Sequence, residues 1–140
     1  MEKLALLTNR KKEPADSRPG VKRLTKSSKI IKTIIEAIQE KKGQHIVSLD
    51  LRKINEAVAD FFIICEASSQ PQIRAIADNI QDKVLEKCSE KPYHHEGATT
   101  AQWILIDYIN VVVHVMHPEN RKFYRLEEMW SDAAAQEHDE

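Results

Sequence analysis

The segment Gln102–Met116, QWILIDYINVVVHVM, decides the fold because it reads as two strands joined at Ile109-Asn110. Successive side chains of a strand point to opposite faces. Pairing the two strands places Trp103 opposite Met116, Leu105 opposite His114, and Asp107 opposite Val112. The other face is apolar or aromatic throughout and consists of Ile104, Ile106, Tyr108, Val111, Val113 and Val115. The hairpin therefore has one core face and one mixed face.

The mixed face has two possible interpretations. A tryptophan, a leucine and a methionine beside an aspartate and a histidine are typical of a partner-binding surface. The same residues can form a second core face that another part of the chain covers. Alternation alone leaves both interpretations open.

The chain has 140 residues, which is enough for one domain with a proper core. Its content of 41% hydrophobic and 31% charged residues is typical of a soluble globular protein. The apolar runs are too short to span a membrane or to form a secretory signal, so we expect a cytoplasmic protein. Cys65 and Cys88 are expected to be small buried hydrophobic residues rather than a disulfide.

Charge is distributed unevenly along the chain. Residues 1–26 hold eight basic and three acidic residues, whereas the remainder holds 13 basic and 19 acidic residues. We expect residues 1–25 to be a disordered basic arm on an acidic body. The arm is either a solubilising tail or an RNA-contacting segment, and its candidate phosphate-binding residues are Lys11, Lys12, Arg18, Lys22 and Arg23.

Helices and strands alternate before the hairpin. A helix is expected from Ser27 or Ser28 to Gly43, followed by strands at 45–51 and 60–65. Ser68 or Ser69 then caps a long helix with Pro71 in its first turn, and its buried stripe falls at helical spacing: Ile73, Ile76, Ala77, Ile80, Val84 and Cys88. A short strand is expected at 93–96.

The C-terminal segment is expected to be one helix from Pro118, with Phe123, Leu126, Met129 and Trp130 toward the core, and residues 134–140 are expected to be an acidic tail. This order predicts an α/β sandwich with a mixed sheet, whose domain covers residues 26–133. Two or three helices of this size cover one sheet face but not both. That reasoning favours an uncovered mixed face.

Enzyme and metal motifs are absent from the sequence. A nucleotidyl-transferring site needs two carboxylates in D-x-D spacing to hold magnesium, but Asp50-Leu51-Arg52 has arginine at the second position. The four histidines at 94, 95, 114 and 117 lack ligand spacing for zinc. We therefore expect no metal, no cofactor and no catalytic activity. A nucleotidyltransferase-like nucleotide-binding enzyme remains the alternative.

Several segments together resemble the bacterial ribosomal silencing factors, also called Iojap-like proteins. The most specific are ADFFIIC with the following helix entry, IRAIAD, EG followed by WILIDY, VVVHVM, and RKFYRLEEMWSDA. The resemblance covers about residues 28–133. It implies a nucleotidyltransferase-type α/β fold that lacks the catalytic residues.

The resemblance also implies a function. Members of this family bind the fourteenth large-subunit ribosomal protein on the intersubunit face, block joining of the small subunit, and lower translation when nutrients are short; free copies are homodimers. By similarity, the docking face includes Trp103 and its neighbours on the hairpin. Because a large aromatic at an interface centre often dominates affinity, we expect Trp103 to be the anchor, with Leu105, His114 and Met116 completing the apolar patch. Asp107 and Glu96 are expected to meet basic groups of the partner.

Two positions depart from the family pattern. The family has Gly-Asp or a similar pair at the hairpin turn, where this chain has Ile109-Asn110. Because isoleucine tolerates positive φ badly, a tight two-residue turn is in doubt and the loop is expected to be longer or bulged. The small residue before the long helix is often glycine in the family and is Ala67 here.

Overall fold

The computed structural model describes residues 28–138, and the basic arm expected at 1–25 lies outside them. Helix α2 (Lys29–Glu40) is followed by strands β1 (Gln44–Asp50) and β2 (Phe61–Glu66), then by helix α3 (Gln70–Cys88). Strands β3 (His94–Glu96), β4 (Trp103–Asp107) and β5 (Val111–Met116) come next. Two short helices, α4 (Pro118–Tyr124) and α5 (Leu126–Met129), precede strand β6 (Ala134–His138).

The strands form one six-stranded mixed sheet in the order β3-β4-β5-β2-β1-β6, which confirms the predicted fold class. β2 and β5 pair in parallel at its centre, and every other pair is antiparallel. The register of β4 on β5 is the one read from alternation, with Trp103 opposite Met116 and Leu105 opposite His114. The sheet therefore presents the two predicted hairpin faces.

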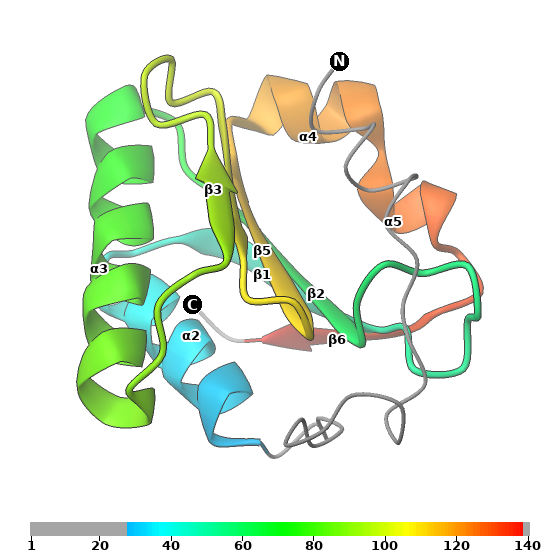
Figure 1. The fold of residues 1–140 in the computed structure, drawn as a ribbon. Coiled ribbons are helices and arrows are strands. Elements are labelled where there is room, and N and C mark those ends of the chain that lie inside the picture. The colour runs from blue at the N-terminus through cyan, green and yellow to red at the C-terminus, as the bar shows by residue number, and fades with distance from the viewer. Residues whose placement is uncertain (1–27, 139–140) are drawn as a thin grey trace.

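Helices α2 and α3 cover the apolar face of the sheet (Figure 1). The stripe predicted for α3 is buried at Ile73, Ile76 and Val84, and Ser69 caps the helix by accepting the Gln72 N–H at 3.3 Å. Ile34 and Ile38 of α2 pack into the same core. Gly43 follows α2 where a Cβ would collide with the Ile38 side chain, so only glycine fits.

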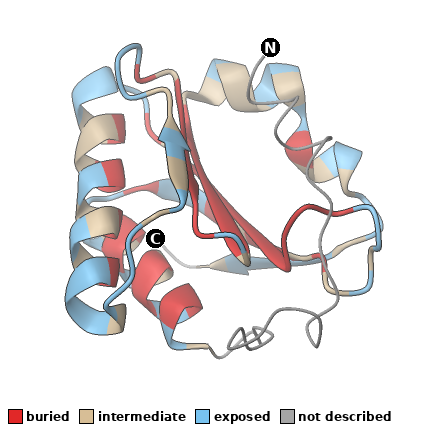
Figure 2. Ribbon diagram, viewed as in Figure 1, coloured by how far each residue is buried: buried red, intermediate tan, exposed pale blue. Residues whose placement is uncertain are grey.

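The mixed face is covered too, contrary to the sequence prediction. It belongs to a second buried cluster. Residues of the 51–59 segment and of α5 contribute to this cluster, and Tyr124 at the end of α4 packs against it. Its buried members are Leu49, Leu51, Ala57, Val58, Ala59, Phe62, Ile64, Trp103, Leu105, Val112, Met116 and Leu126. Figure 2 shows burial on both sides of the central strands. The prediction failed because it counted only regular helices as cover and left out the 51–59 connection.

The C-terminal segment also differs from its prediction. It breaks at Arg125, whose φ of 49° is left-handed, into α4 and α5. The break changes the helical phase, so Leu126 is buried while Phe123 and Met129 are exposed. Residues 134–138 are not a frayed tail, because β6 pairs with β1 along its whole length. The mixed sheet therefore gains an edge strand at the C-terminal end of the chain.

The hairpin turn is tight despite its sequence. Ile109 adopts a φ of 74°, and the Asn110 N–H donates to the Tyr108 carbonyl at 2.9 Å across it. The Tyr108 N–H donates to the Val111 carbonyl at 2.9 Å, so only Ile109 and Asn110 lie beyond this last hydrogen-bonded pair of the hairpin. The expectation of a longer loop is wrong, and the cost is a strained isoleucine.

Candidate functional site: a buried aromatic cluster beneath an exposed helical surface

The structure brings the six predicted docking residues onto neighbouring strands, but it buries five of them. Trp103 is only 3% exposed, and Leu105, Asp107, His114 and Met116 are fully buried. Glu96 lies on edge strand β3, half-buried, with its Oε1 2.7 Å from His94 Nε2. An exposed Trp103 face is therefore ruled out for the isolated chain.

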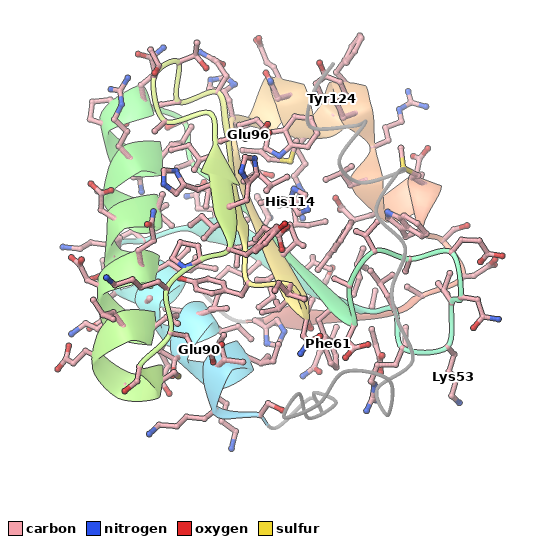
Figure 3. All side chains as sticks on the ribbon, in the orientation of Figure 1. Lys53, Phe61, Glu90, Glu96, His114 and Tyr124 are labelled. Atoms are coloured by element: carbon pink, nitrogen blue, oxygen red, sulfur yellow. The ribbon has the colours of Figure 1, made fainter. Side chains whose placement is uncertain are left out.

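Trp103 and His114 form the centre of this face. The Trp103 indole N–H donates to His114 Nδ1 at 3.1 Å, so the imidazole is an acceptor at that nitrogen. The His114 ring meets Phe62 edge-on at a centroid distance of 4.8 Å. Trp103 also lies 4.8 Å from the ring of Tyr124, the last residue of α4. The ring contact between Trp103 of β4 and Tyr124 thus holds α4 against the sheet. Figure 3 labels His114 and Tyr124.

Asp107 has a local structural role. Its Oδ1 accepts the Ile109 N–H at 2.7 Å, which holds the strained turn in place. Because Asp107 is fully buried, it is not available to meet basic groups of a partner as the sequence predicted.

Arg121 fixes α4 from a second direction. Its guanidinium, with a side chain only 10% exposed, donates to the His45 carbonyl at 2.6 Å and lies 3.2 Å from Glu66. It also makes a two-pronged contact with Glu127 at 3.2 Å on both oxygens. One planar side chain therefore joins β1, β2, α4 and α5, which requires the fork geometry of arginine.

The exposed side of these helices carries large apolar groups. Phe123 is 77% exposed and Met129 is 47% exposed. Lys122 and Arg125 are also exposed, and Arg125 lies 3.6 Å from Glu128. We call Lys122, Phe123, Arg125 and Met129 the α4–α5 surface. Sequence reasoning missed it because the C-terminal segment was treated as one continuous helix.

The other side chains that could serve catalysis or metal binding make structural contacts instead. Asp50 Oδ2 lies 2.6 Å from the Arg52 guanidinium, which occupies the position a second metal-binding carboxylate would need. Ser69 caps α3, and His114 Nδ1 accepts the Trp103 indole N–H. Within residues 28–138, no group of three or more His, Cys, Asp or Glu side chains is placed to hold a metal. No helix in this range is long and apolar enough to cross a membrane.

Burial shifts two ionisable groups. Desolvation raises the pKa of the Cys65 thiol to about 12, so that group stays protonated at neutral pH. Desolvation, with a smaller contribution from Glu90, also raises the pKa of Tyr108. Both groups belong to the core under α2 and α3, and neither is suited to nucleophilic chemistry.

The fold and the site define a mixed-sheet α/β protein in which short helices with exposed Phe123 and Met129 cover a packed aromatic cluster. The family model described as "Ribosomal silencing factor during starvation" matches residues 24–140. The chain belongs to the ribosomal silencing factor family, as its sequence resemblance indicated. The name of the family describes a regulatory role in translation rather than a catalytic one.

Individual relatives support this assignment. The chain is 39% identical over 104 residues to "Ribosomal silencing factor RsfS" of Bacillus subtilis, covering 74% of this chain and 86% of the relative. It is 36% identical over 107 residues to the protein of the same name from Halalkalibacterium halodurans, covering 76% and 90%. A crystal structure of a Chromobacterium violaceum protein superposes with a TM-score of 0.68 at 34% identity, covering 73% of this chain and 83% of that one.

Proposed function

We propose that this protein represses translation by binding the large ribosomal subunit and sterically blocking joining of the small subunit when nutrients are limiting. The partner is the fourteenth ribosomal protein of the large subunit, on the intersubunit face, and binding takes place in the cytoplasm. Membership of the silencing-factor family is the observation that carries the proposal. Its mechanism is competition for a surface, in which no covalent bond is made or broken.

We assign docking to the α4–α5 surface rather than to the buried Trp103. Phe123 and Met129 are large apolar side chains that remain in water in the described structure. Aromatic residues and methionine are enriched at protein interfaces, where a central aromatic often dominates the affinity. Lys122, Arg125 and Glu128 are exposed on the same part of the chain and carry charges of both signs, and the rim of a protein interface is typically polar.

In this arrangement Trp103 is a positioning residue. It supports Tyr124 directly beneath the exposed end of α4, and His114 holds the indole in turn. Leu105 and Met116 belong to the same buried cluster as Leu126 of α5. The residues that the sequence named for docking therefore act through the helices that cover them, and Glu96 lies on β3, which is not part of the α4–α5 surface.

Co-sedimentation with purified large subunits on sucrose gradients tests the assignment. Phe123→Ala removes an exposed ring, so we expect an unchanged fold and loss of co-sedimentation by at least about tenfold, the size typical of an interface hot spot. Tyr93→Ala is the matched control, because Tyr93 is 69% exposed but precedes β3. If Phe123→Ala binds large subunits as well as Tyr93→Ala does, the α4–α5 surface is not the docking site.

Two further features follow from the family resemblance. We propose that the free protein is a homodimer, which size-exclusion chromatography with light scattering tests. We also propose that residues 1–25 contribute at most a salt-dependent contact with ribosomal RNA. Deleting them should leave large-subunit binding intact at low salt, whereas loss of binding would favour the RNA-binding alternative.

The enzyme alternative has a separate test. A nucleotidyltransferase-like activity would require magnesium-dependent binding of ATP or CTP, which isothermal titration calorimetry measures. We expect no heat of binding, because Arg52 occupies the position of the second carboxylate and pairs with Asp50.

A further inference from the structure

A second exposed surface lies between α3 and the edge strand β3, away from the α4–α5 surface. Gln81, Asp82 and Leu85 of α3, the 90–92 connection, and His95 of β3 line a groove of about 360 Å³. In Figure 1, α3 and β3 run alongside each other at this edge of the sheet. The groove therefore has a helix on one side and a strand edge on the other.

The strand edge is available for main-chain pairing. β3 ends the sheet and pairs only with β4 among residues 28–138. Alternate N–H and C=O groups of such an edge point away from the sheet and accept a further strand. An extended peptide that lies between a strand edge and a helix gains main-chain hydrogen bonds from the strand, and its side chains occupy pockets beside the helix.

The groove also offers apolar contact. Leu85 is 48% exposed on α3. His95 lies opposite Ile106, whose side chain belongs to the core under α3, so His95 projects to the α3 side of the sheet. His95 itself is exposed. Leu85 and His95 therefore both present side chains along the path of an added strand.

The charge of the groove indicates the chemistry of the occupant. Asp82 and Glu90 line it, and Asp78 lies one helical turn before Asp82 on the same side of α3. These three carboxylates form no ion pair within the part of the chain that the structure describes. Lys91 is the one lysine or arginine among the lining residues. An acidic groove favours a basic segment.

We propose that the α3–β3 groove binds an extended basic peptide segment of a partner protein as an added strand on β3. Its basic side chains meet Asp82 and Glu90, and an apolar side chain packs on Leu85. The site uses different elements from the α4–α5 surface, so it does not rest on the proposed large-subunit docking.

A fluorescence-anisotropy titration tests the proposal with a labelled nine-residue peptide in which lysine or arginine alternates with valine. Its control is the same peptide with glutamate at every basic position. We expect saturable binding of the basic peptide alone, weakened at least tenfold in the double variant Asp82→Lys, Glu90→Lys. Glu128→Lys is the matched charge reversal on α5 and should bind normally. All variants change exposed residues, and circular dichroism checks their folding.

Hydrogen–deuterium exchange distinguishes strand addition from simple charge attraction. Bound basic peptide should slow exchange of the amides at 93–96 and leave those of β6 at 134–138 unchanged. The Phe123→Ala variant should still bind the peptide, which separates this site from large-subunit docking. The proposal is overturned by equal binding of the acidic peptide, by full binding in the double variant, or by protection that appears away from β3.

Discussion

The Trp103→Ala variant tests whether Trp103 is a core residue or a docking residue. Trp103 is 3% exposed, packs on Tyr124 and donates a hydrogen bond to His114. Truncating a buried aromatic of this size costs about 3–5 kcal/mol. Domains of this length have total stabilities of about 5–15 kcal/mol. We therefore expect a large fall in the guanidinium midpoint and a thermal midpoint at least about 10 °C lower.

Two further variants make this prediction specific. Trp103→Phe keeps most of the packing but loses the N–H donor to His114, so we expect a cost of about 1–2 kcal/mol with docking retained. Phe123→Ala should change stability by no more than about 0.5 kcal/mol because its ring is exposed. A fully stable Trp103→Ala protein that has lost large-subunit binding would refute the structural account and restore Trp103 as the anchor.

Three other predictions follow from single features of the structure. Arg121→Lys should lose about 1–3 kcal/mol in urea unfolding, because lysine cannot reproduce the forked contacts with Glu127, and a stability equal to wild type would show that charge alone suffices. Ile109→Gly should raise the unfolding free energy by about 0.5–1 kcal/mol by relieving a positive φ at an exposed position, and a lower stability would contradict the proposed strain. Folding raises the pKa values of Cys65 and Tyr108, so the native state holds these protons more tightly; stability should fall as pH rises from about 9 toward 12, and a flat profile measured by denaturant titration would contradict this.

The sheet could be predicted because side chains alternate between its two faces, and this pattern is visible within a short stretch of sequence. Strict alternation from Trp103 to Met116 fixed both hairpin faces and the register. The stripe of α3 and the cap at Ser69 follow from helical spacing and from the position of Pro71. These patterns depend on residues within one or two turns or strands of each other, so they can be read without knowing the tertiary structure.

The cover of the mixed face could not be predicted in the same way. In the 51–59 segment, Leu51, Ala57 and Val58 are buried, but their spacing matches neither a helix nor a strand. The sequence therefore contains no periodic pattern that predicts this segment as cover for the mixed face. The break at Arg125 occurs without glycine or proline, and it lets Leu126 be buried while Phe123, three residues earlier, is exposed. The sequence therefore predicted the strands on which these residues lie but not their burial.

The same reasoning explains the turn and the C-terminal strand. Ile109 adopts a φ that its side chain disfavours because the Asp107 carboxylate and the tight strand connection hold it there. The β6 strand is short and carries two alanines with polar neighbours, a composition that resembles a tail. Its pairing with β1 is a long-range contact that local propensity does not encode.

Light scattering of mixed ribosomal subunits tests the central claim most directly. Small subunits added to large subunits that are pre-incubated with the wild-type protein should give little of the scattering increase that accompanies joining. The Phe123→Ala protein should leave that increase intact, and Tyr93→Ala should block it like wild type. Normal joining in the presence of saturating wild-type protein would contradict the account.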